Sequence, residues 1–213
     1  MTYIVCIPVA LLVVSGNLAS GNIRIPETGG WTPPVDGMTY FDGTPWWLSW
    51  DGLYRGTWFN AAEFYGYPTS YCIQESEMWF YHHSSYPWDT SEVWFHVYNG
   101  DQMAPVDELD QTQTTAAHCS AVEVVYDPGI CCEQNFWVIA NTEMSKGGWP
   151  SLIGDNTANY WGEDHSFYSD DFIVWEPWPL EGPVANDYWM ATEPEPWNPG
   201  FESATWGAVK TLF

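Results

Sequence analysis

Two adjacent histidines and two serines, His82 to Ser85, come nearest to a hydrolytic site in this chain. Hydrolysis of this kind needs a nucleophile and a base within hydrogen-bond reach. On an extended chain His82 and His83 point to opposite faces, so they could not act together on one atom. No G-x-S-x-G segment is present to expose a serine. Because SSYPWDTSE has the Ser, Asp and Pro of a turn, we interpret this stretch as a structural corner and assign no catalytic residue.

Aromatic side chains are the second chemical candidate, because sugar rings stack on exposed Trp and Tyr while nearby Asp, Asn and His bind hydroxyls. Pairing of residues 78–83 with residues 92–98 would gather the carbohydrate-binding candidates on one shelf: Trp79, Tyr81, Trp88, Trp94, His96 and Tyr98. The alternative is that these rings fill a core short of Leu and Ile, since large aromatics are usually mostly buried. Both interpretations stay open on the sequence alone.

The acidic segment 154–171 offers the hard oxygen ligands that Ca²⁺ prefers. The calcium candidates are Asp155, Asn156, Glu163, Asp164, Asp170 and Asp171. Their spacing does not follow the EF-hand pattern. A structural calcium ion is the only cofactor suggested, and a solvated acidic loop without metal is the alternative.

Pairs of carboxylates on strand-like runs also have to be considered for glycoside hydrolysis. That chemistry needs two carboxyl groups at a defined separation across a cleft. The acids on such runs are Glu75, Glu77, Glu92 and Glu123. Acids are abundant throughout this chain, so their presence on strands is not specific for the reaction.

The overall charge restricts the class of partner. The 213 residues include 28 Asp or Glu against four Lys or Arg, for a formal net charge of −24. Such a surface repels phosphate backbones and anionic lipids, which excludes nucleic-acid binding. Sixteen Trp and thirteen Tyr favour strands over helices.

The chain opens on MTYIVCIPVALLVVSGNLASGN, which we interpret as a secretory signal. Ile4 to Val14 is an apolar run too short to cross a bilayer, and small residues follow it to Gly21, where cleavage is expected. The usual basic residues before the run are missing, and a buried N-terminal strand is the alternative. Export predicts a secreted or cell-surface protein with no transmembrane segment in the mature chain.

An exported mature chain would keep four cysteines, Cys72, Cys119, Cys131 and Cys132. In an oxidising compartment an even number predicts two disulfides, with three possible connectivities. We favour the two that avoid a strained bridge between the adjacent Cys131 and Cys132. A zinc site is the rival interpretation, but no C-x-x-C spacing supports it.

Short strand-like runs closed by turn residues recur at 46–50, 56–59, 70–83, 92–100, 121–129, 134–141, 171–177 and 187–192. They predict an all-β fold, an antiparallel jelly-roll-like β-sandwich of about eight strands with long Gly/Pro-rich loops. The expected division is a signal peptide at 1–21, an irregular lead-in at 22–45, the sandwich at 46–192 and a C-terminal tail at 193–213.

Three segments give local predictions. The run at 92–98 puts Val93, Phe95 and Val97 on one face, as expected for an inner strand with the core on that side and aromatic cover on the other. YDPGICC, at 126–132, has Pro at the second position of a turn and predicts a hairpin. NAAEFYG, at 60–66, predicts one helical turn.

Over roughly residues 46–192 the chain resembles secreted, largely uncharacterised β-sandwich proteins of environmental Gram-negative bacteria, which often carry C-terminal sorting segments. The segments that carry the resemblance are WWLSWDGLYRGTWF, MWFYHHSSYPWDTSEVWFHVYNGD, FWVIANTEMSKGGWPSLIGDN, HSFYSDDFIVWEPW and NDYWMAT. The end, ATWGAVKTLF, is similar to the short terminal segments of such proteins. The resemblance implies a β-sandwich and supplies no catalytic motif, so no functional residue is carried over.

Together these features predict a non-enzymatic secreted or cell-surface sandwich for adhesion, matrix or surface interaction, with a glycan or a cell-surface protein as partner. A carbohydrate-binding module that uses the six side chains named above is the alternative. An extracellular hydrolase is the third hypothesis, and it requires His82 or His83 to meet an acid and a hydroxyl in one cleft.

Overall fold

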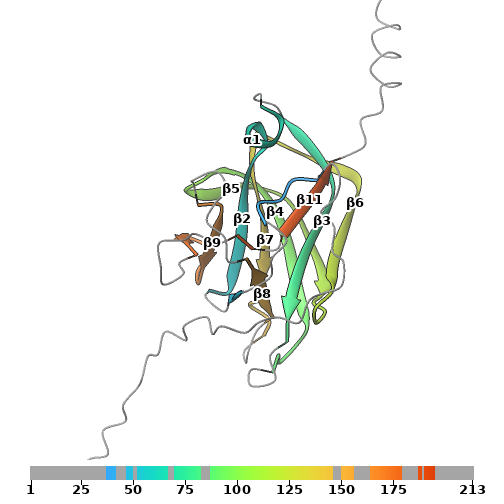
Figure 1. Cartoon of the computed structure of the whole chain (residues 1–213), viewed down its shortest axis with the longest axis vertical. Coiled ribbons are helices and arrows are strands. Elements are labelled where there is room, and N and C mark those ends of the chain that lie inside the picture. Colours follow the sequence, from blue (N-terminus) through green and yellow to red (C-terminus); the bar gives the residue numbers. More distant parts are fainter. Residues whose placement is uncertain are drawn as a thin grey trace, which may run out of the picture.

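The computed structural model is an all-β sandwich of two antiparallel sheets packed on each other (Figure 1). This confirms the predicted all-β sandwich, and the described residues form eleven strands and one short helix where about eight strands were expected. The structure describes residues 37–41, 47–49, 52–66, 70–82, 87–145, 150–155, 164–178, 187–188 and 190–194.

Five strands form the first sheet, and β3 is its centre. β3 pairs with β6 and with β11 along most of its length, and its last two residues, Phe80 and Tyr81, pair with β8. β1 pairs only with β8. The strands are β1 (Trp47–Ser49), β3 (Tyr71–Tyr81), β6 (Ala121–Cys132), β8 (Ser151–Gly154) and β11 (Met190–Pro194).

Six strands form the second sheet, in the order β10-β9-β2-β7-β4-β5. The central strands β2 and β7 pair residue for residue from Tyr54–Asn141 to Asn60–Asn135. The strands are β2 (Tyr54–Asn60), β4 (Glu92–Asp101), β5 (Ala104–Thr115), β7 (Asn135–Asn141), β9 (Ser166–Ser169) and β10 (Glu176–Pro177).

The main core lies between the two sheets and is built by alternation along the strands. Val93, Phe95 and Val97 of β4 are buried in it, which confirms the face predicted for that run. The Phe59 and Phe136 rings stack there with centroids 5.3 Å apart. Burying such side chains stabilises the fold by roughly 1.5–3 kcal/mol each.

The predicted helical turn is confirmed as α1 (Ala61–Tyr65). The Asn60 side chain accepts a hydrogen bond from the Ala62 amide at 3.2 Å and so caps the first turn. Gly66 ends the turn in the left-handed region, with φ 74°.

The predicted hairpin at YDPGICC is wrong, because β6 continues through it. Pairing passes from Ile73–Ile130 directly to Glu75–Val125, so residues 126–129 form a bulge opposite Gln74. Pro128 lies in this bulge after a cis peptide bond. Proline has no amide hydrogen for the ladder, so within a strand it is confined to such irregular positions.

Three further segments differ from the sequence prediction. No strand was predicted at β5, because its Asp, Gln and Thr residues lack strand periodicity, and none was predicted at β8. The strand expected over 171–177 is wrong, because bends occupy 170–173 and only Glu176–Pro177 pair. Asp, Gln and Thr on an edge strand give little hydrophobic signal.

The described part of the lead-in belongs to the sandwich. Met38 exchanges backbone hydrogen bonds with Thr192 at 2.9 and 3.0 Å, and Met38, Tyr40 and Phe41 are buried. The predicted signal peptide, the cleavage position and the C-terminal tail beyond Pro194 lie outside the described residues. Among the described residues no helix is long and apolar enough to cross a membrane.

Candidate binding face

The outer face of the six-stranded sheet carries rows of aromatic and polar side chains set by strand register. Trp94, Asn141 and Tyr54 lie opposite one another across β4, β7 and β2. Four residues further along β4, Tyr98 lies opposite Trp137, and Trp137 lies opposite Trp58. Because these positions alternate with core positions, they all face away from the main core.

An apolar layer covers part of this outer face. Its buried residues are Trp58, Trp137, Ile139, Phe167 and Trp175. Tyr54, Tyr98, Ala104 and Phe172 pack against the layer and stay partly exposed. Partly exposed aromatic side chains therefore border the buried layer. Together they form the aromatic cover that was predicted for this side of β4.

A tight loop between β9 and β10 holds Phe172 on the sheet. The Asp171 carboxylate accepts hydrogen bonds from the Ile173 and Val174 amides at 2.8 and 3.0 Å, and these bonds lower the pKa of Asp171. The Ser169 hydroxyl accepts a hydrogen bond from the Phe172 amide at 2.9 Å. Phe172 has a φ of 64°, an uncommon conformation for a bulky residue.

Gly56 leaves room for the apolar layer in the middle of the sheet. A Cβ atom at this position would lie 2.9 Å from Ile139 Cγ1 and 3.3 Å from Trp137 Cε3. The missing side chain allows both residues to pack flat over β2.

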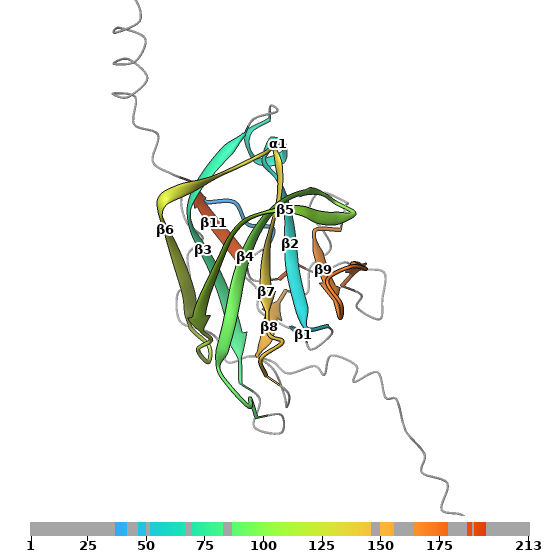
Figure 2. The same ribbon diagram turned by 180° about the vertical axis from the view of Figure 1, so that it is seen from behind.

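The end of the β4–β5 hairpin covers another edge of the layer. The Trp137 indole donates to the Asp101 carbonyl at 2.8 Å, and the Gln102 amide donates to the Asp164 carbonyl at 2.8 Å. Two register shifts in β4, after Val97 and after Asn99, accompany this bend. Figure 2 shows the hairpin end reaching across to β9.

Carboxylates fix the polar ends of the exposed rings. Tyr54 donates its hydroxyl hydrogen bond to Glu143 at 2.8 Å, and burial followed by this contact raises the pKa of Tyr54 to about 12. Burial, followed by the charge and hydrogen bond of Glu108, raises the pKa of Tyr98 to about 12. His96 Nδ1 lies 2.9 Å from Glu108 Oε1.

Phe172 contacts three other rings of this face. Its centroid lies 5.0 Å from the partly exposed Tyr54, 5.2 Å from the partly exposed Tyr98 and 6.3 Å from the buried His96. Its plane is tilted by 82° to Tyr54 and by 50° to Tyr98, so these rings do not form one flat platform. We call Tyr54, His96, Tyr98, Glu108, Asn141, Glu143 and Phe172 the aromatic cup.

The structure divides the six residues of the predicted shelf among three places. Trp94, His96 and Tyr98 lie together on the outer face of β4. The predicted pairing of 78–83 with 92–98 is wrong, because β3 and β4 belong to different sheets. Trp79 and Tyr81 contribute to a small cluster with Phe41, Leu48 and Ile153, and Trp88 packs against the main core.

The sequence prediction missed most of the aromatic cup. Tyr54 could have been found, since Tyr54, Gly56 and Trp58 alternate along β2 with the core positions. Glu108 lies on the unexpected strand β5, and Phe172 lies on a loop whose fold over the sheet has no sequence signal. The β4–β5 hairpin brings Glu108 to Tyr98, and the loop after β9 brings Phe172 to it.

The turn predicted at SSYPWDTSE lies partly outside the described residues. His82, which precedes it, lies next to Trp88. Its Nε2 accepts a long hydrogen bond, 3.4 Å, from the Trp88 amide, and the two rings lie 4.8 Å apart. The His82 amide donates to His118 Nδ1 at 3.0 Å. His83, Ser84 and Ser85 lie outside the described residues.

Three acids considered for glycoside hydrolysis meet on the outer face of the first sheet. Carboxylate oxygens of Glu75, Glu77 and Glu123 lie within 4.8 Å of one another. Glu92 lies on β4 in the other sheet. Hard cations prefer oxygen ligands, so this acidic trio has ligands of a suitable type, although three adjacent surface acids alone do not define a metal site.

The described calcium candidates do not form a single group. Asp164 lies before β9, whereas Asp170 and Asp171 lie after it. Asp155 is buried and accepts a hydrogen bond from the Asp187 amide at 3.0 Å. Asn156 and Glu163 lie outside the described residues.

A buried polar network joins α1 to β9 and to the lead-in. Glu63 accepts the Tyr40 hydroxyl at 2.8 Å and lies 3.0 Å from His165 Nε2. The Tyr40 and His165 rings stack with centroids 3.5 Å apart, and burial is the main cause that raises the pKa of Tyr40. This network positions α1 within the fold and was not predicted from the sequence.

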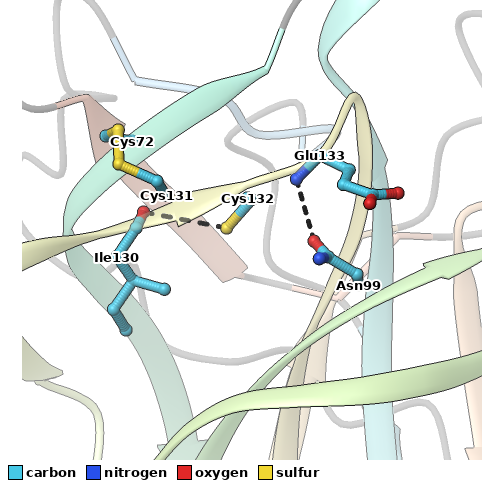
Figure 3. The surroundings of a disulfide bond; sticks show 6 residues. All are labelled: Cys72, Asn99, Ile130, Cys131, Cys132 and Glu133. Atoms are coloured by element: carbon cyan, nitrogen blue, oxygen red, sulfur yellow. Dashed lines mark hydrogen bonds between the residues drawn. A yellow bond between two sulfur atoms is a disulfide. The ribbon is translucent and has the colours of Figure 1, made fainter.

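Cys72 and Cys131, opposite each other on β3 and β6, form a disulfide. This is one bond where two were expected, and Cys119 and Cys132 are free thiols. Figure 3 shows the Cys132 sulfur directed away from the disulfide toward the Ile130 carbonyl. Adjacent strand residues face opposite sides, so Cys131 is exposed while Cys132 enters the core.

Comparison with known proteins finds no matching family model, no matching curated protein and no matching solved structure. The site is therefore interpreted from its own geometry.

Proposed function

We propose that this chain is an exported β-sandwich that binds a ligand and catalyses no reaction. We further propose that the aromatic cup binds saccharides. One observation carries the proposal: Tyr54, Tyr98 and Phe172 are partly exposed, and Phe172 contacts both tyrosine rings. The Tyr54 hydroxyl donates to Glu143, and Glu108 lies opposite Tyr98 on β5. Aromatic rings with fixed polar tips offer an apolar surface for a sugar ring and acceptors for its hydroxyls.

The tilt between the rings restricts which kinds of saccharide can bind. Rings at 82° and 50° to Phe172 cannot all stack on one flat surface. Tilted rings of this kind fit one or two sugar units of a soluble chain better than the flat surface of a crystalline polysaccharide. Glu108 contacts both His96 and Tyr98, which supports a role in holding the rings in place.

Calorimetric titration with soluble oligosaccharides tests the proposal. Tyr98→Ala should reduce the affinity about tenfold, which corresponds to about 1.4 kcal/mol, because the sugar loses the apolar face of the ring. Tyr81→Ala, on the other sheet, is the matched control and should leave the affinity unchanged. Absence of oligosaccharide binding, or equal affinity in Tyr98→Ala and wild type, would overturn the proposal.

Adhesion to a protein surface is the second candidate function, and exposed apolar residues favour it. Met103 at the hairpin end is 79% exposed, and Ile173 in the loop after β9 is 78% exposed. Exposed apolar side chains mark contact surfaces where they form a contiguous patch, so this candidate requires both residues to contact the partner together. Replacing both with Ser should weaken attachment to protein-coated surfaces without changing saccharide affinity; unchanged attachment would remove this candidate.

A further inference from the structure

We propose that the aromatic cup selects saccharides that carry free, protonated amino groups over neutral or acidic saccharides. This inference rests on the function proposed above and names the chemical class of the ligand. Two observations support it: carboxylates surround the rings, and the described cationic side chain, Arg55, is buried away from them.

The cup is edged by carboxylates that solvent can reach. The Glu108 side chain is 39% exposed while it contacts His96, and Glu143 is exposed while it accepts the Tyr54 hydroxyl. Asp170 and Asp171 add two exposed acids on the loop that holds Phe172. Each carboxylate oxygen can accept more than one hydrogen bond, so contacts with tyrosine or histidine leave acceptor capacity for an ammonium group.

The described cation does not neutralise these acids at the surface. Arg55 is the only Lys or Arg among the described residues, and it is fully buried. Its guanidinium donates into the interior, to the Ser49 carbonyl at 2.8 Å and to the Thr142 hydroxyl at 2.6 Å. The described surface therefore presents acids without an exposed Lys or Arg, within a chain of formal net charge −24.

Two attractions favour binding of an ammonium group beside the aromatic cup. It is attracted to the carboxylates, and it is attracted to the faces of Tyr and Phe rings by their quadrupoles. A uronic acid or a sulfated sugar meets only repulsion. Acetylation of the amino group removes both gains while it keeps the sugar ring that stacks. We expect protonated amino sugars to bind about tenfold more tightly than their N-acetylated counterparts.

The experiment compares short glucosamine oligomers with N-acetylglucosamine oligomers of equal length, at a pH where the amines are protonated. The full chain should bind the amino form about tenfold more tightly, and the preference should shrink as salt is added. Glu143→Gln should lower the ratio of the two affinities, because it removes one carboxylate charge beside Tyr54. Glu133→Gln, an exposed acid on the short β6–β7 connection, removes the same charge elsewhere and should keep the preference.

The outcomes separate this inference from the proposed function. Equal affinity for both oligomers, or equal loss of preference in Glu143→Gln and Glu133→Gln, would overturn the selection for amino sugars and leave saccharide binding intact. Failure of both oligomers to bind, together with failure of neutral and acidic ones, would overturn the proposed function itself.

Discussion

The role of each histidine and tyrosine follows from its neighbours more than from its residue type. His82 lies in the sequence motif that most resembles a catalytic site, yet its ring contacts the Trp88 amide at a corner. His96, in an ordinary strand, lies between Glu108 and Asn141, with ring nitrogens at 2.9 and 3.3 Å from them. The β4–β5 hairpin supplies Glu108 and the pairing of β4 with β7 supplies Asn141, so no single sequence motif marks this arrangement.

The tyrosines of the cup predict a loss of stability at high pH. Tyr54 and Tyr98 have folded pKa values of about 12, above the ordinary value of 10.0. The unfolded chain loses these protons first, so their contribution is complete below pH 10 and is lost as pH rises toward 12. Urea unfolding should show a falling free energy of unfolding over that range, with a shallower fall when both are changed to Phe. An identical slope in both proteins would contradict this assignment.

At the scale of the elements, β2 and the loop after β9 build the site together. β2 is buried on both faces, because it meets the core on one side and the apolar layer on the other. The segment after β9 places Trp175 within this layer and Phe172 against it. The centroids of these two rings lie 5.4 Å apart, and their planes are at 79°. A strand covered on both faces must have small residues where the cover comes closest, and Gly56 meets that need.

Gly56→Ala should destabilise the protein by about 1–3 kcal/mol, because the added methyl forces Ile139 or Trp137 to move. Chemical denaturation measures the loss, and the near-ultraviolet circular dichroism of the Trp layer should change with it. In an Ile139→Ala background the nearest clashing atom is gone, so the same substitution should cost less. Equal costs in the two backgrounds would show that the methyl is accommodated in another way.

At the scale of the whole molecule, repulsion among the many acidic residues destabilises the fold, and burial of aromatic side chains stabilises it. Like charges destabilise a compact fold, and apolar burial between the sheets and under the outer layer has to outweigh them. The repulsion is concentrated at the acidic trio, where Glu77 and Glu123 lie directly opposite on β3 and β6. Trp79 donates a short hydrogen bond to Glu77 and so offsets part of this repulsion.

Glu123→Gln should raise the free energy of unfolding by about 0.5 kcal/mol at low salt, since like charges directly opposite in a sheet repel. The gain should fall as salt is added, because Glu123 is exposed and screened. Thermal melts of wild type, Glu123→Gln and Glu133→Gln measure it, and the Glu133 variant should gain less. A lower melting temperature for Glu123→Gln would mean that the trio holds a cation that stabilises the fold.

The sequence by itself determined the all-β class, most of the apolar strands, the single helical turn and the buried face of β4, because these depend on local alternation and turn residues. It gave no strand at β5 or β8 and predicted a hairpin at Pro128, where the tertiary structure has a bulge opposite Gln74. The disulfide partner of Cys72, the separation of Trp79 from Trp94 and the meeting of Tyr54, Tyr98 and Phe172 were decided only in the tertiary structure. The physical reason is that periodicity fixes which way a side chain points along one strand, whereas pairing between distant strands fixes what it meets.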